Sequence, residues 1–166
     1  RRCRPRNRRP AMSARPRLAT LDQALATCQG HAQALGDALA DIERRQFSSG
    51  DLDRLDKADR RLLDQFAYRY TRLQDDMGAP LMPAVLTALG EDVVALSALD
   101  RFNRLEQLSW LPSADEWMEL RQVRNQFTHE YPESAEERFE RFSAAVAAAT
   151  RLVDLLDGFE RRLERL

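Results

Sequence analysis

The chain has 166 residues, a mass of 19.1 kDa and a net charge of −1, the size of one domain that can bury a core without disulfides or a metal. Leu and Ala supply 47 residues, whereas Val and Ile supply only 7, so the composition favours helices, excludes an all-β architecture and argues against alternating strand–helix units. No stretch approaches the roughly 18 consecutive apolar residues of a membrane helix, so we expect a soluble protein.

Charge is distributed unevenly along the chain. Residues 1–17 contain eight Arg and no acidic residue, which leaves a charge of −9 on residues 18–166. Such an acidic body repels phosphate backbones, so any nucleic-acid binding has to be confined to a local basic patch. The chain begins with Arg and its first Met is Met12. We interpret residues 1–17 as a disordered or non-native segment, with a nucleic-acid-binding arm as the alternative, and residues 18–166 as one helical domain.

Cysteine usage indicates the compartment. Cys3 and Cys28 form no Cys-x-x-Cys motif and have no His pair nearby. We therefore expect neither a disulfide framework nor a zinc site, and a cytoplasmic location. No apolar run follows the basic residues, so the pattern of a signal peptide is missing.

Helical periodicity predicts two long helices in the first half of the chain. The first is predicted from a capping box at Thr20 to about Phe47, where Ser48-Ser49-Gly50 ends it. The second is predicted from Asp51 to the break at Met77-Gly78-Ala79-Pro80. We expect these two helices to pair antiparallel.

The second half of the chain continues with a short helical segment over residues 82–89 and three further helices. Each of the three follows a Ser that has an acidic residue three positions later; these caps are Ser97, Ser113 and Ser134. The predicted ends lie near Trp110, near Tyr131 and near Leu163. Together the elements predict an all-α, up-and-down bundle of five to six helices.

Two histidines restrict the catalytic options. His31 lies in the first predicted helix with no carboxylate one turn away along the chain, and we interpret it as a solvated helix residue. His129 has different neighbours, because Arg124 and Asn125 precede it and Tyr131 follows it.

On a helical wheel the segment from Trp117 to Tyr131 has a buried stripe about 120° wide. The stripe consists of Trp117, Leu120, Val123, Phe127 and Tyr131. Arg124 lies at its edge, whereas Asn125 and His129 lie on the opposite side, about 140° from Arg124 in the case of His129. A second copy of the helix across a two-fold axis brings two Arg and two His into one cleft. We therefore expect a homodimer through the face of Asn125 and His129, with Arg124 and His129 exposed enough for Ala to cost little stability.

An Arg–His pair suits the cleavage of RNA. His129 lies in the last turn of its helix, where the dipole favours imidazolium, and this suits a general acid or base. A guanidinium stabilises charge on the phosphate under attack by its own 2′-hydroxyl, so the pair needs no metal or cofactor. The alternative is an exposed His in a favourable dipole contact, with the Arg side chains paired to nearby glutamates.

Other candidates for a site are weaker. Asp75-Asp76 could face the cleft, but we interpret them as a solvated helix end. Trp110 and Trp117 lie at helical spacing and are interpreted as core rather than as base-stacking platforms. The chain has no Gly-rich phosphate loop, so it is not itself a nucleotidyltransferase.

The stretch from Trp117 to Pro132, above all Arg124-Asn125-x-x-x-His129-x-Tyr131, resembles the R-x4-H-x-Y signature of HEPN-domain proteins. In particular it is similar to HepT-like toxins that are paired with a minimal nucleotidyltransferase antitoxin. The predicted order of helices, over roughly residues 18–163, resembles that family too.

This resemblance implies a homodimeric, metal-independent endoribonuclease, the toxin of a type VII-like toxin–antitoxin module. Arg124 and His129 of both subunits would be catalytic, with Asn125 and Tyr131 in support. Tyr131 is the position at which the nucleotidyltransferase partner adds AMP to neutralise the toxin, and we expect its ring at the edge of the stripe and its hydroxyl at the mouth of the cleft. One alternative is a non-catalytic helical subunit that binds a nucleotidyltransferase and presents its substrate; another is a helical scaffold with no link to nucleotides.

Overall fold

The computed structural model describes residues 14–129 and 131–166, and every regular element in this part of the chain is helical. The α-helices are α1 (Ala14–Arg45), α2 (Lys57–Asp76), α3 (Met82–Ala88), α4 (Ala98–Gln107), α5 (Ala114–His129) and α6 (Ala135–Leu163). A 3-10 turn, η1 (Asp51–Asp53), precedes α2, and a π-helical turn, η2 (Met77–Leu81), joins α2 to α3. The all-α prediction is confirmed for the described residues.

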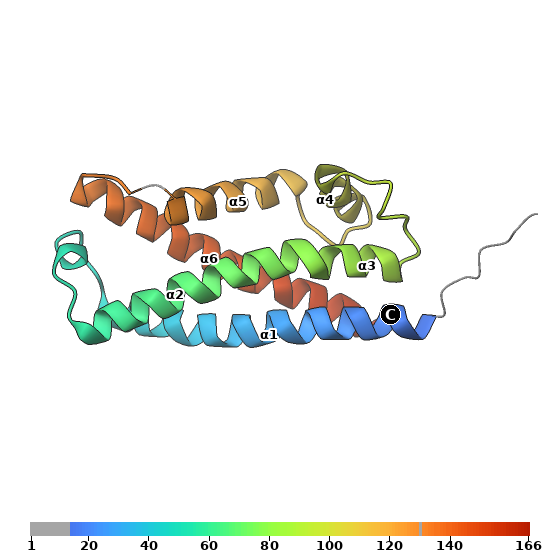
Figure 1. Ribbon diagram of the computed structural model, residues 1–166, viewed down its shortest axis with the longest axis horizontal. Coiled ribbons are helices and arrows are strands. Elements are labelled where there is room, and N and C mark those ends of the chain that lie inside the picture. The colour runs from blue at the N-terminus through green and yellow to red at the C-terminus, as the bar shows by residue number, and fades with distance from the viewer. Residues whose placement is uncertain (1–13, 130) are drawn as a thin grey trace, which may run out of the picture.

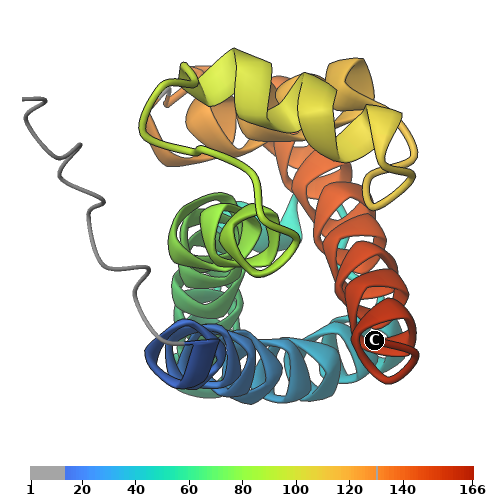
Figure 2. The ribbon, with the colours of Figure 1, turned by 90° about the vertical axis from the view of Figure 1, so that its right-hand side faces the viewer.

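The helices form a bundle around the paired α1 and α2 (Figure 1). These two helices run antiparallel, as predicted, and α3 continues the direction of α2 along α1. Helices α4 and α5 lie on the other side of α2 and α3, and α6 passes obliquely from α5 to the side of α1 (Figure 2). The end of α2 therefore lies between α1 and the α4–α5 layer.

Two predicted helix starts are wrong. The first helix begins at Ala14 rather than at Thr20, so Thr20 lies inside it; residues 1–13 of the predicted basic segment lie outside the described residues. The second begins at Lys57 rather than at Asp51, because the carboxylate of Asp56 accepts from the backbone N–H of Asp59 at 2.8 Å and caps it there.

The predicted end of the second helix at Met77-Gly78-Ala79-Pro80 is confirmed, because α2 ends at Asp76 and the chain bends there before α3. Ala79 leaves the helical region with φ −161° and ψ 108°, and Pro80 follows it. The helical path nevertheless resumes directly at Met82. The residue before Pro is disfavoured in the α conformation, which accounts for the extended backbone at Ala79.

The three predicted Ser caps are confirmed. The hydroxyls of Ser97, Ser113 and Ser134 each accept from the backbone N–H three residues later, at 3.1 Å in every case. Each bond satisfies one of the free N–H groups at a helix start.

The core contains the large aromatic side chains predicted for it. Trp110 and Trp117 are buried, and the ring of Phe66 on α2 packs edge-on against Phe127 of α5 and Phe142 of α6. These contacts fix α5 and α6 against α2. None of the described helices has the combined length and apolar character that crossing a membrane requires.

Candidate functional site

The motif predicted to carry chemistry lies on the C-terminal half of α5. Trp117 and Leu120 are buried, and Val123 and Phe127 pack partly buried against the core, as the helical wheel predicts. Tyr131 does not belong to this stripe, because α5 ends at His129 and the Tyr131 side chain is 86% exposed. The prediction that its ring lies at the edge of the stripe is therefore wrong, and the side chain is more exposed than expected.

Arg124 faces inward, towards the end of α2. Its Nη2 donates to Oδ1 of Asp75 at 2.6 Å, and its side chain is only 15% exposed. The expectation that Arg124 is an exposed residue is wrong, because the edge of the apolar stripe meets α2 where a carboxylate is present. Removing Arg124 leaves Asp75 unpaired, so the substitution costs more stability than one at an exposed position.

His129 and Asn125 lie on the exposed side of α5, as predicted. In the described residues no hydrogen bond joins His129 to Arg124. Five residues of helix separate the two by about 7.5 Å along the axis and about 140° around it. One chain alone therefore does not bring the two side chains together.

The exposed side of α5 is hollowed by a shallow groove of about 510 Å³. It is lined by Asp115, Met118, Glu119, Arg121, Gln122 and Asn125. Met118 is a large apolar side chain that is 39% exposed here. The groove thus lies on the same face that the sequence predicts as a dimer interface.

The junction of α2 and α5 also contains a set of unpaired polar atoms, which we call the polar seam. It consists of Tyr70 Oη, the side-chain amide of Gln74, Trp117 Nε1 and Arg124 Nε; all are buried without a hydrogen-bond partner among the described residues. Burial raises the pKa of Tyr70 well above its usual value, and the positive charge of Arg124 opposes this only in part. Nothing in the sequence pattern predicted these unpaired groups.

His31 is not a solvated helix residue. Its side chain is 12% exposed and lies between α1 and α2. Arg69 Nη1 is 3.1 Å from His31 Nδ1, and because a guanidinium can only donate, Nδ1 is the acceptor and Nε2 carries the proton. Nε2 then donates to Oδ2 of Asp76 at 3.3 Å. The sequence prediction failed because the carboxylate comes from α2, distant along the chain.

The Asp75-Asp76 pair is likewise not a solvated helix end. Asp76 is only 8% exposed and binds both His31 and Arg72, whereas the partly exposed Asp75 binds Arg124. We call the group of His31, Arg69, Arg72 and Asp76 the histidine cluster. It occupies the α1 side of α2, opposite the polar seam.

Cys28 lies one turn before His31 and is fully buried as a free thiol. Burial, with a smaller contribution from the negative charge of Asp76, raises its pKa to about 12. A thiol that remains protonated is a poor nucleophile, so the arrangement does not support cysteine catalysis.

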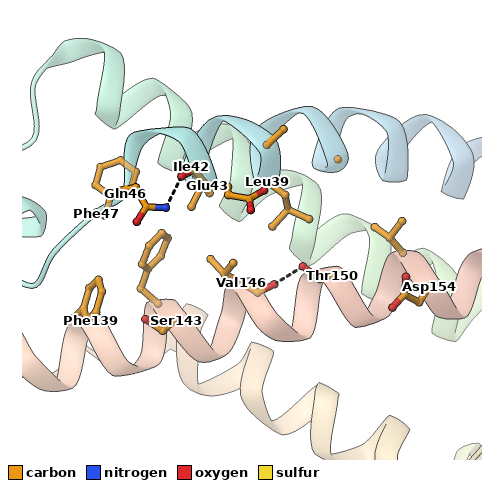
Figure 3. Close-up of a pocket in the computed structure, with 14 residues that line it drawn as sticks. Leu39, Ile42, Glu43, Gln46, Phe47, Phe139, Ser143, Val146, Thr150 and Asp154 are labelled. Carbon is orange, nitrogen blue, oxygen red and sulfur yellow. Dashed lines mark hydrogen bonds between the residues drawn. The ribbon is translucent and has the colours of Figure 1, made fainter.

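A cavity of about 710 Å³ lies elsewhere, between the second half of α1 and α6 (Figure 3). Leu39, Ile42 and Phe47 on one side face Phe139 and Val146 of α6 on the other. Its lining is mainly apolar and includes none of the predicted site residues.

Comparison with known proteins gives no relative: no family model, no curated protein and no solved structure matches the chain.

Proposed function

We propose that the chain is a metal-independent endoribonuclease that acts as a homodimer, as the toxin of a module whose antitoxin is a nucleotidyltransferase. The proposal rests on the sequence Arg124-Asn125-x-x-x-His129-x-Tyr131 at the end of α5. The resemblance of this motif to HepT-like HEPN proteins supports it, as does the all-helical architecture.

The single observation that carries the proposal is that Arg124 and His129 face different sides of the last two turns of α5. Arg124 is held in one orientation by Asp75, whereas Asn125 and His129 are exposed beside a groove that includes Met118. A second copy docked on this groove brings its own His129 towards the first, which a single helix cannot do. Two-fold packing thus brings the two His129 side chains together.

The chemistry follows from these groups. His129 takes the proton of an RNA 2′-hydroxyl, whose oxygen attacks the adjacent phosphorus while the 5′-oxygen of the next nucleotide leaves with a proton from the second His129. The products are a 2′,3′-cyclic phosphate and a free 5′-hydroxyl. Arg124 stabilises the charge that develops on the phosphate oxygens.

The exposed Tyr131 supports a route to neutralisation. Its phenolic oxygen is open to attack the α-phosphorus of ATP held by a nucleotidyltransferase, with pyrophosphate as the leaving group. The added AMP brings a phosphate charge close to the end of α5, where it competes with RNA for the guanidinium.

An RNA-cleavage assay with the purified full chain and a chelator tests the proposal. We expect cleavage by the wild type, and His129→Ala to lower its rate by about 100-fold or more. Arg162→Ala, an exposed substitution on α6, is the control and should cleave at the wild-type rate. No cleavage by any form, or equal cleavage by wild type and His129→Ala, contradicts the proposal.

A second candidate function is a non-catalytic subunit that binds a nucleotidyltransferase and presents its substrate. The ion pair between Arg124 and Asp75 favours it, because a neutralised guanidinium is less available to RNA. Mass measurement with the partner and ATP separates the two. Addition of AMP to wild type but not to Tyr131→Phe supports a toxin whose inhibition is covalent, whereas partner binding without RNA cleavage supports the non-catalytic subunit.

A further inference from the structure

A second cavity, of about 350 Å³, lies where the end of α2, the η2 turn, the start of α4 and the middle of α5 meet. Three arginines from two helices line it: Arg101 of α4, and Arg121 and Arg124 of α5. Asp75 is the one acidic residue among the nine that line it. In an acidic protein, the cavity has a local formal charge of +2.

Each of the three guanidiniums is held in place by a separate contact. Arg101 donates from Nε and Nη2 to the backbone carbonyl of Val93, at 3.2 and 2.9 Å. Arg121 lies over the ring of Phe102, with Cζ 5.7 Å from the ring centre. Arg124 is fixed by Asp75. Because each guanidinium has five N–H donors, these contacts leave donors free on all three.

Gln74 gives the independent indication of a ligand. It lines the same cavity, is only 1% exposed, and neither its side-chain nitrogen nor its oxygen has a hydrogen-bond partner among the described residues. Arg124 Nε is also buried, and none of the described residues provides it with a hydrogen-bond acceptor. A buried amide without partners costs stability, and such groups are rare in proteins unless something else satisfies them.

We propose that this cavity binds the phosphate group of a ribonucleotide. Phosphate oxygens accept from several guanidiniums at once, and the Gln74 side-chain nitrogen supplies a neutral donor at the buried end. The volume is at the lower end of the range for small-molecule sites, which suits one nucleotide. The site goes beyond the proposed ribonuclease function; it shares Arg124 with the proposed catalytic residues and Arg121 with the groove of the proposed dimer.

Calorimetric titration of the full chain tests the proposal, with AMP, adenosine and inorganic phosphate as probes. We expect AMP and phosphate to bind and adenosine not to bind. Arg101→Gln and Arg121→Gln should each weaken AMP binding about tenfold or more. Arg104→Gln is the matched control, because Arg104 lies on α4 but pairs with Glu91 and does not line the cavity; it should bind AMP like the wild type.

Further arms identify the source of the phosphate and separate the two proposals. A short oligoribonucleotide that binds only with a 5′-phosphate assigns the site to a chain end, whereas binding of AMP alone assigns it to a free nucleotide. His129→Ala should keep AMP binding whether or not it cleaves RNA. Circular dichroism verifies that each variant is folded. Absence of AMP binding, equal binding of adenosine, or unchanged affinity in both folded cavity variants overturns the proposal.

Discussion

In the described part of the chain, buried polar groups are hydrogen-bonded on one side of α2 and lack partners on the other. On the α1 side, the histidine cluster pairs its groups: Arg69 with Nδ1 of His31, Nε2 of His31 with Asp76, and Asp76 with Arg72. On the α5 side, five atoms of the four residues in the polar seam have no hydrogen-bond partner among the residues that the structure describes. Each group includes residues of α2 that lie within two turns of the end of that helix.

This difference indicates that the paired groups stabilise the fold, whereas the unpaired groups are available to bind a ligand. A satisfied buried network contributes to stability and fixes the register of the two helices that it joins. Unpaired buried atoms lower stability and are explained best where a ligand completes them. The proposed phosphate cavity lies beside the polar seam. The histidine cluster contains no predicted catalytic residue.

The largest effect is expected from breaking the paired side. Asp76→Ala removes the acceptor of both His31 and Arg72 and should lower the free energy of unfolding by about 2–3 kcal/mol. Urea denaturation measures this. Asp157→Ala, an exposed carboxylate on α6, is the control and should change it by less than about 0.5 kcal/mol. Equal effects of the two substitutions would show that the cluster adds nothing to stability.

The opposite sign is expected on the unpaired side. Gln74→Leu replaces a buried amide that has no partner by an apolar group of similar size, so it should raise the free energy of unfolding by about 1 kcal/mol. The same variant should bind AMP more weakly. A loss of stability instead would mean that the amide is satisfied in solution and that the contrast between the two sides is false.

The histidine cluster should also make stability depend on pH. Burial is the main cause that lowers the pKa of His31, with the charges of Arg69 and Arg72 acting in the same direction and Asp76 opposing them. The unfolded chain therefore binds this proton at a higher pH than the folded chain, and the stability present above about pH 6.5 falls as the pH is lowered towards the folded pKa. The slope for one proton cannot exceed about 1.4 kcal/mol per pH unit. Denaturation at several pH values should show this slope in wild type and a flatter one in His31→Gln.

The smallest effect is expected at Tyr70. Tyr70→Phe deletes the unpaired hydroxyl and keeps the stacking of the ring on Phe66, so the free energy of unfolding should rise by about 0.5 kcal/mol. Above pH 10 the difference in the free energy of unfolding between the variant and wild type should grow. Burial raises the pKa of Tyr70, so the unfolded wild type ionises first and its stability falls with pH, whereas Phe does not ionise. If Tyr70→Phe lowers the free energy of unfolding instead, the Tyr70 hydroxyl has a hydrogen-bond partner in solution and the prediction is wrong.

Sequence patterns predicted the elements well where the signals are local. Ser97, Ser113 and Ser134 each cap a helix because the hydroxyl and the N–H that it accepts from are three residues apart. The pattern was misleading at Thr20, where a capping box lies inside a longer helix, and at Asp51, where a 3-10 turn precedes the true cap. Capping residues indicate a possible start, and competition with neighbouring turns decides which one is used.

The sequence by itself determined the all-α class, the apolar face of α5 and the exposure of Asn125 and His129, because helical periodicity relates residues only a few positions apart. The tertiary structure alone decided that Arg124 meets Asp75, that His31 meets Asp76, and that Arg101 shares a cavity with Arg121. These residues are between 20 and 49 positions apart. Their pairing depends on how helices pack against each other, which one-dimensional spacing does not encode.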